Sequence, residues 1–211
     1  MILYGAPVSP FVRKVLAFAA EKGIALELVP VGLGDPNPDF ISASPFRKMP
    51  ALRDGDFTVS DSTAIVTYLE GKHPDPPMIP NDPADRSRTI WFDEFADTIL
   101  TAAGGKIFFN RVVSPKFLGK LGDEAAATLG EEELVPIFTY LESVIPASGH
   151  LVGNTLTLAD IAVASPFVNL AHAGFALDAN VYPKLSAYLA AIHARPSFSD
   201  WIGREKKMLG L

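Results

Sequence analysis

Ser9 is the residue of this chain whose type and position point most directly to chemistry. It follows a short apolar run and directly precedes a segment that opens with proline, as many helices do. A helix N-terminus stabilises an anion, and a serine hydroxyl placed there can donate a hydrogen bond to that anion. The same position also suits a simple helix cap, so the residue alone leaves both roles open.

Two further segments place polar groups beside a constrained backbone. Met49 and Pro50 follow Lys48 and open an apolar stretch. Proline here predicts a cis peptide bond, which exposes the preceding backbone for pairing, although an ordinary edge-strand proline also fits. Asp61 and Ser62 begin another expected helix, where they suit either an anion site or a cap.

Other common chemistries lack their residues. The chain has no cysteine, which excludes disulfides, thiolate nucleophiles, cysteine-ligated zinc and iron–sulfur clusters. Its four histidines are scattered without metal-ligand spacing, so no metal is expected. No phosphate-binding loop or nucleophile elbow is present, and we interpret Gly104-Gly105-Lys106 as a helix kink.

The elements that position these residues divide at a proline-rich linker. Residues 73–83 hold five of the eighteen prolines, which stop both helices and strands, and we assign the linker to residues 75–83. Before it, residues 1–74 read as a small α/β domain of order β-α-β-(α)-β-β-α. Strands are expected at residues 2–4, 26–31, 51–53 and 57–59, and helices at residues 10–22, 39–42 and 62–70, the last stopped by Gly71.

After the linker, residues 84–211 read as an all-α bundle. Helices are expected at residues 84–113, 122–145, 157–173 and 182–194, with a short piece near 198–202. Thr157 and Asp160 have the form of a capping box at the start of the third.

Composition excludes several classes of partner. The chain has 211 residues, 48% of them hydrophobic, and a net charge of −6 without a basic stripe, which disfavours nucleic-acid binding. No apolar run approaches membrane-spanning length, and the N-terminus does not resemble a signal peptide. We therefore expect a soluble cytoplasmic protein with no membrane partner.

Five segments in this order resemble the glutathione transferase family: residues 3–15, 48–52 and 61–65, the linker, and residues 157–160. The resemblance covers essentially the whole chain. The Ser-Pro-Phe form is most similar to the serine-type classes, which are tau, phi and bacterial relatives. It implies a thioredoxin-like N-terminal domain that binds glutathione as co-substrate, and a helical domain that binds a hydrophobic electrophile.

The resemblance also implies roles for individual residues. Ser9 would donate a hydrogen bond to the glutathione sulfur, and the Met49 backbone before cis-Pro50 would pair with the cysteinyl part. Asp61 and Ser62 would hold the γ-glutamyl end, and Lys48 would lie near the glycyl or γ-glutamyl carboxylate.

Some assignments stay open among candidates. Tyr4 is a rival donor to Ser9, because tyrosine-type relatives use a phenol at the end of this strand. Arg13 could assist Ser9, but surface or interdomain pairing of Arg13 and Lys14 fits better. The electrophile pocket is assigned to Phe11, Phe95 and Phe108, which equally suit a simple core.

Phe46 matches a position where some dimeric classes insert an aromatic residue into the partner subunit, so we expect a homodimer. The chain departs from the family's pattern at Arg47, where relatives often carry glycine, and this adds bulk and charge near the glutathione edge or the dimer interface.

The expected activity is conjugation of glutathione to an electrophile, as in detoxification. Isomerase, lyase or dehalogenase chemistry would use the same thiolate. A non-catalytic binding protein on this fold is the third alternative.

Overall fold

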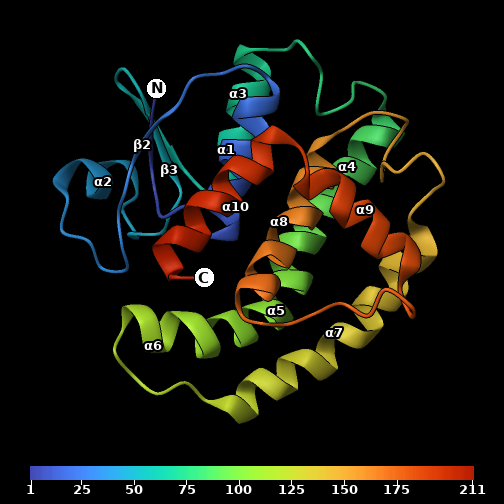
Figure 1. Ribbon diagram of the computed structural model, residues 1–211. Coiled ribbons are helices and arrows are strands. Elements are labelled where there is room, and N and C mark those ends of the chain that lie inside the picture. Colours follow the sequence, from blue (N-terminus) through green and yellow to red (C-terminus); the bar gives the residue numbers. More distant parts are fainter. The chain divides into compact units, whose positions relative to one another are not determined.

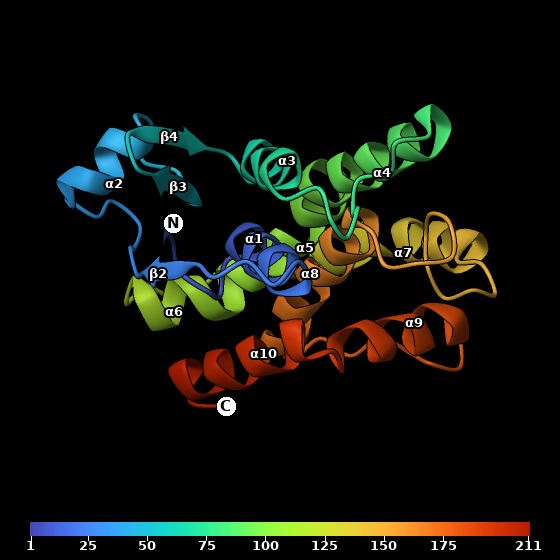
Figure 2. The ribbon, with the colours of Figure 1, turned by 90° about the horizontal axis from the view of Figure 1, so that it is seen from above.

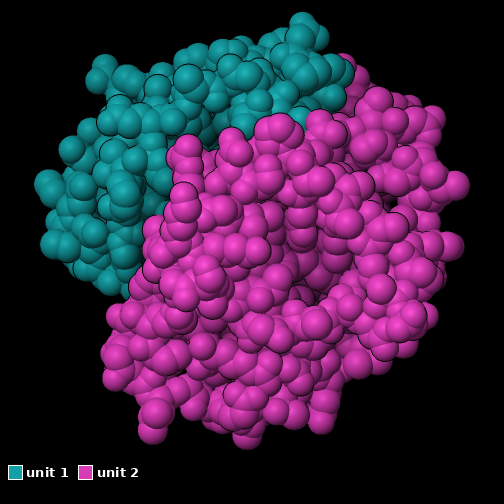
Figure 3. Space-filling view, in the orientation of Figure 1, with its two compact units in different colours: residues 1–79 teal, residues 80–211 magenta.

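The computed structural model describes residues 1–211, which form two compact units, residues 1–79 and residues 80–211 (Figure 3). No helix in either unit combines the length and the apolar character needed to cross a membrane.

The first unit is built on a four-stranded sheet of order β2-β1-β3-β4. β1 and β2 are parallel, and the other neighbours are antiparallel. The strands are β1 (Ile2–Tyr4), β2 (Glu27–Val29), β3 (Ala51–Asp54) and β4 (Phe57–Ser60), and the helices are α1 (Pro10–Glu21), α2 (Pro38–Ala43) and α3 (Ser62–Lys72). Two views place α2 on one side of the sheet and α1 and α3 on the other (Figures 1 and 2). The expected element order is confirmed, and the fold is thioredoxin-like.

Successive side chains of β1 point to opposite faces of the sheet and contribute to the core on both. Tyr4 belongs to a buried cluster with Phe40 of α2 and with Val31, and Leu3, which points to the opposite face, is fully buried. Gly5 then lets the chain pass close to α1, because a Cβ at this position would lie 2.4 Å from a methyl of Val12.

A buried ion pair fixes the start of the proline-rich segment to the first unit. The side chain of Lys22 is fully buried, and its ammonium donates to Glu70 Oε2 at 2.7 Å and to the carbonyl of Pro76 at 2.5 Å. Glu70 Oε1 accepts the backbone N–H groups of Met78 and Ile79 at 3.0 and 3.1 Å. The segment is therefore held by charge-assisted hydrogen bonds as well as stiffened by proline.

The second unit contains only helices. Residues 83–117 form one continuous helical run in which α-helical pieces alternate with π-helical turns. These are α4 (Pro83–Phe95), η1 (Ala96–Leu100), α5 (Thr101–Phe108), η2 (Phe109–Val113) and α6 (Ser114–Phe117), followed by α7 (Glu124–Val144), α8 (Leu158–His172), α9 (Pro183–His193) and α10 (Pro196–Leu209). α8 is buried almost throughout, as expected of a central helix that is apolar on all sides.

The predicted capping box at the start of α8 is confirmed. The backbone N–H of Thr157 donates to Asp160 Oδ2 at 2.9 Å, and Leu151 N–H donates to Oδ1 at 2.8 Å. The Tyr188 hydroxyl lies 3.2 Å from Oδ1. Burial raises the pKa of Asp160, although these donors oppose the shift. The carboxylate therefore joins α8 and α9 to the loop that precedes them.

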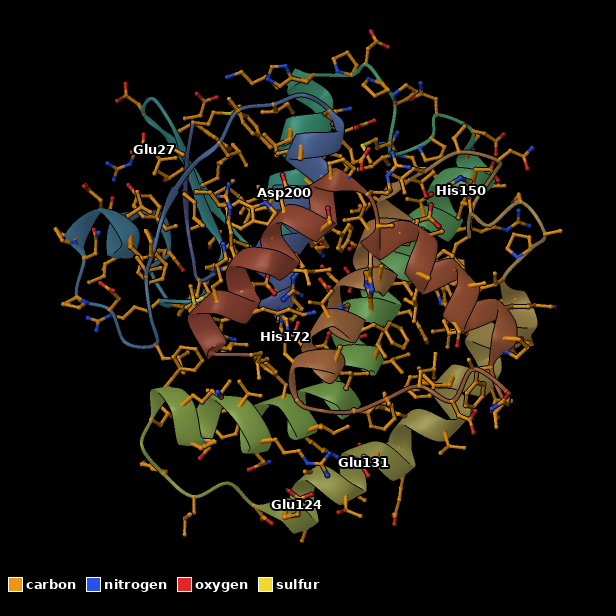
Figure 4. All side chains as sticks on the ribbon, viewed as in Figure 1. Glu27, Glu124, Glu131, His150, His172 and Asp200 are labelled. Carbon is orange, nitrogen blue, oxygen red and sulfur yellow. The ribbon has the colours of Figure 1, made fainter.

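Charge pairs join α7 to the long helical run. Glu124 and Glu131, labelled in Figure 4, both project from α7 and pair with Arg111 of η2. Hydrogen bonds to the two carboxylates raise the pKa of the Arg111 guanidinium above its usual range. Lys106 of α5 and Glu133 of α7 form a second pair at 2.6 Å.

Two local predictions are wrong. Gly71 lies inside α3, which ends one residue later, and the last helix is α10, much longer than the piece expected near residues 198–202. α5 includes Gly104 and Gly105, and π-helical turns lie before and after it. Gly104 instead allows close packing, because a Cβ there would lie 3.2 Å from Leu170 of α8.

We predict that Lys22→Met lowers the free energy of unfolding of the first unit by about 3 kcal/mol, because Glu70 would be left with an uncompensated, largely buried charge. Hydrogen exchange of α3 amides at increasing urea concentration measures this loss.

Lys72→Met is the matched control, because it removes the exposed pair with Asp54 in the same unit and is expected to change stability far less. Equal losses in the two variants would contradict a stabilising role for the buried Lys22–Glu70 pair.

Candidate functional site

The register of the sheet brings three separate segments to one edge. Tyr4, the last residue of β1, lies opposite Ala51, the first of β3, and Ala51 lies opposite Ser60, the last of β4. Because these pairings are antiparallel, the loop after Tyr4, the residues before Ala51 and the residues after Ser60 emerge together.

Two hydrogen bonds join the three segments directly. Ala6 N–H donates to the sulfur of Met49 at 3.4 Å, and Asp61 N–H donates to the carbonyl of Pro50 at 3.3 Å. The Met49–Pro50 peptide bond is cis, as the sequence predicts. The structure therefore places the loop that carries Ser9 beside Met49 and Pro50, and these beside Asp61.

Ser9 occupies the cap position of α1, but its hydroxyl makes no cap hydrogen bond. Its backbone is extended (φ −74°, ψ 128°), and its carbonyl accepts the N–H of Arg13 at 2.9 Å. The hydroxyl thus lies at a helix N-terminus without serving the helix, which leaves it able to donate to a bound anion.

Asp61 and Ser62 begin α3 at the same edge. Asp61 Oδ1 accepts a hydrogen bond from the N–H of Ala64 at 3.0 Å, so Asp61 caps the N-terminus of α3. Its φ of 87° lies in the left-handed region that favours glycine, a costly conformation for any other residue. Ser62 follows with its side chain almost fully buried. Two helix N-termini, of α1 and α3, consequently face one sheet edge.

A clamp made by Ser44 shapes the turn before Met49. The buried Ser44 hydroxyl donates to the Lys48 carbonyl at 2.7 Å and accepts Lys48 N–H at 3.0 Å. Arg47 N–H donates to the Ser44 carbonyl at 2.8 Å. The side chain of Lys48 is exposed beside Met49. Ser44 was not among the residues expected at the site, because nothing in the sequence distinguishes a serine between a helix and a turn from any other serine.

The rival donor Tyr4 is buried in the core of the first unit. Its ring packs on the α2 side of the sheet, 6.2 Å from Phe40, with the Arg53 guanidinium 6.0 Å from its centroid. Ser9 directly precedes α1, which covers the other side.

Arg13 and Lys14 do not lie on the surface, contrary to one of the two roles expected for them. Both side chains are buried in α1, and the Lys14 ammonium lies 3.4 Å from the Thr63 hydroxyl.

The three aromatic pocket candidates lie on three different helices. Phe11 lies on α1 and is half-buried. Phe95 is buried in an aromatic cluster, with ring centroids 5.4 Å from Trp91 and 5.6 Å from Tyr140. Phe108 of α5 is buried thirteen residues further along the same helical run. Their place in an electrophile pocket stays a prediction.

Comparison with known families gives matches across most of the chain. The sequence matches the family profile "Glutathione S-transferase, N-terminal domain" over residues 3–77, and the profile "Glutathione S-transferase, C-terminal domain" over residues 109–205.

Curated relatives and solved structures agree with these profiles. The chain is 33% identical to a glutathione S-transferase of Hyoscyamus muticus, over 96% of this chain and 97% of that protein. It is 31% identical to glutathione S-transferase 3 of Zea mays, over 95% of this chain and 92% of that protein. The crystal structure of a glutathione S-transferase from Rhodospirillum rubrum superposes with a TM-score of 0.86 at 25% identity, covering 95% of this chain and 90% of that one.

We predict that Asp61→Ala destabilises the N-terminus of α3 by about 1 kcal/mol, because the Ala64 N–H loses its acceptor. Asp61→Asn keeps an acceptor and tolerates a positive φ, so most of this stability is retained. Hydrogen exchange at Ala64 measures both variants, and equal protection in the two would contradict the cap.

Proposed function

The chain belongs to the glutathione S-transferase family, and we propose that Ser9 activates the thiol of bound glutathione for attack on an apolar electrophile. The protein is a glutathione transferase, with glutathione as its co-substrate. We propose which residues hold glutathione, and that the electrophile is apolar.

The observation that carries the proposal is the position of Ser9. Its hydroxyl lies at the N-terminus of α1 without capping it, in the loop that contacts Met49. A donor at a helix N-terminus, beside a backbone able to pair with a peptide, suits the sulfur of a bound cysteinyl group. Asp61 and Ser62, joined to Pro50 at the same edge, suit the charged γ-glutamyl end.

The energies are sufficient for this chemistry. Lowering a thiol pKa from about 8.5 by two units requires about 2.7 kcal/mol. A helix N-terminus contributes about 0.3–2 kcal/mol, and a hydrogen bond to a charged group contributes about 1.5–3 kcal/mol. Ser9 therefore stays protonated and donates, while the thiol proton leaves to solvent. The thiolate then supplies the electron pair for the new carbon–sulfur bond. In a substitution the leaving group departs with its bonding pair, and in an addition the displaced π pair takes a proton from solvent.

Other reactions of a glutathione thiolate begin from the same state. An isomerase, lyase or dehalogenase would need the same donor and the same tripeptide site, and would differ in side chains of the helical unit. A non-catalytic binding protein would not require Ser9, Met49 and Asp61 to converge on one edge. This convergence favours the transferase over a scaffold.

We expect the protein to act in the cytoplasm, where reduced glutathione is abundant and a chain without cysteine is insensitive to thiol exchange. Conjugation of apolar electrophiles there would serve detoxification.

We predict that Ser9→Ala lowers kcat by about 10- to 100-fold at neutral pH with a chloronitrobenzene as electrophile, because a hydrogen bond to charge is lost from the thiolate. The Kd of glutathione should change much less, since the backbone and Asp61 contacts remain. Calorimetry and a pH titration of the ultraviolet thiolate absorbance separate the two effects.

Tyr4→Phe is the matched hydroxyl deletion on the other side of the sheet, and it should keep kcat. Turnover lost in Tyr4→Phe but retained in Ser9→Ala would overturn the donor assignment. Product analysis by mass spectrometry distinguishes conjugation from isomerisation or elimination.

We also propose a homodimer in which Phe46 packs into the partner subunit. Phe46 is 87% exposed on the turn before Met49, an unfavourable position for so large an apolar ring unless a partner covers it. Light scattering should give a mass about twice the 22.6 kDa of one chain, and Phe46→Ser should shift the equilibrium toward the monomer. A single-chain mass for the unmodified protein would contradict the dimer.

A further inference from the structure

The side chain of Met49 contacts the loop that carries Ser9. Its sulfur accepts the backbone N–H of Ala6 at 3.4 Å, and both residues are only partly exposed. The two residues are 43 positions apart in the sequence, so this contact exists only in the folded chain. A thioether sulfur is a weak acceptor, and a hydrocarbon side chain of the same size could not accept at all. The contact therefore depends on the sulfur and not only on the shape of the side chain.

A second hydrogen bond connects Ala6 to Ser9. The Ala6 carbonyl accepts the N–H of Ser9 at 2.9 Å and closes a β-turn between these residues. The Ser9 carbonyl in turn accepts the N–H of Arg13 in the first turn of α1. Both backbone groups of Ala6 are therefore used, the N–H toward Met49 and the carbonyl toward Ser9.

The Ser9 hydroxyl depends on this loop for its position. The N–H of Gly5 donates to the Val29 carbonyl at 3.1 Å, which fixes the start of the loop to β2. Pro7 and Pro10 carry no N–H and cannot add backbone donors. The Ser9 hydroxyl makes no cap hydrogen bond to α1, so its place follows that of its backbone. A contact that holds Ala6 consequently also decides where this hydroxyl lies.

Donation to a thiolate is sensitive to small displacements. A hydrogen bond weakens steeply as the donor angle falls below about 120°. A misplacement of about 1 Å in a catalytic group can cost about 100-fold in rate. A weak contact that fixes the loop can therefore change turnover by more than its own modest contribution to stability suggests.

We propose that Met49 is a positioning residue, whose sulfur holds Ala6 and thereby holds the Ser9 hydroxyl where it can donate to the glutathione thiolate. This inference rests on the proposed function. It gives the Met49 side chain a role of its own, separate from the pairing proposed for the Met49 backbone. The sulfur acts on the protein's own loop and reaches the reaction only through Ser9.

Met49→Leu tests the proposal, because leucine keeps nearly the same volume but offers no acceptor to the Ala6 N–H. We measure kcat at saturating glutathione with a chloronitrobenzene, and titrate the ultraviolet thiolate absorbance of bound glutathione. We expect kcat to fall by about three- to tenfold, and the pKa of the bound thiol to rise toward its value in free glutathione. Met208→Leu is the matched control, because Met208 is 52% exposed on α10, and it should retain both properties.

A double variant distinguishes positioning of Ser9 from a general structural effect. If Met49 acts through the Ser9 hydroxyl, Met49→Leu should cause almost no further loss of kcat in a chain that already carries Ser9→Ala. A residue that merely stabilised the unit would lower kcat by the same factor in both backgrounds.

Hydrogen exchange of the Ala6 amide tests the contact in the native chain. This amide should exchange slowly in the native protein and faster in Met49→Leu, while the Gly5 amide, which donates to Val29, keeps its protection in both. Unprotected Ala6 in the native chain would overturn the inference even if Met49→Leu did not fold.

Two kinetic results would also overturn the inference while leaving the proposed function intact. One is an unchanged kcat in Met49→Leu, and the other is an equal loss with and without the Ser9 hydroxyl. An unchanged kcat in Ser9→Ala alone would instead overturn the proposed function, and this inference with it.

Discussion

The pairing of β3 with both β1 and β4 is the constraint on which the candidate site depends. A strand paired in one register fixes which residues emerge at its end, and a slip of one residue would exchange the two faces of the sheet. Here the register sets Tyr4, Ala51 and Ser60 in one row. The loop of Ser9 and the start of α3 are separated by about fifty residues in sequence, and this row makes them neighbours.

The site is built mainly from backbone ends and short polar side chains. Two helix N-termini, the Met49–Pro50 segment and one hydroxyl supply partial positive charge and hydrogen-bonding groups. Each contribution is small, but they add at one point because the backbone is held in place beforehand. Arg47 and Asp61, the two non-glycine residues with positive φ, flank Met49 and Pro50 in the sequence. Backbone strain is therefore concentrated next to the candidate site.

The helical unit is organised around α8, whose start is fixed by a buried carboxylate. Asp160 takes hydrogen bonds from its own helix start, from the preceding loop and from Tyr188. Two backbone N–H groups and the Tyr188 hydroxyl offset part of the cost of burying this carboxylate, although burial still raises its pKa. This network belongs to folding rather than to catalysis.

The sequence by itself determined the order of elements and the capping box of α8, and it offered a cis bond before Pro50 as one of two alternatives. These features are local: proline, glycine, capping residues and hydrophobic period act within a few positions. Tertiary structure alone decided which face Tyr4 occupies, that Arg13 and Lys14 are buried, that Ser44 clamps the turn and that Lys22 holds the linker. Each of these depends on residues distant in sequence, and no local pattern records which distant groups will meet. For the same reason the sequence left Ser9 with two possible roles, cap or donor, and only the folded chain shows that its hydroxyl makes no cap hydrogen bond to α1.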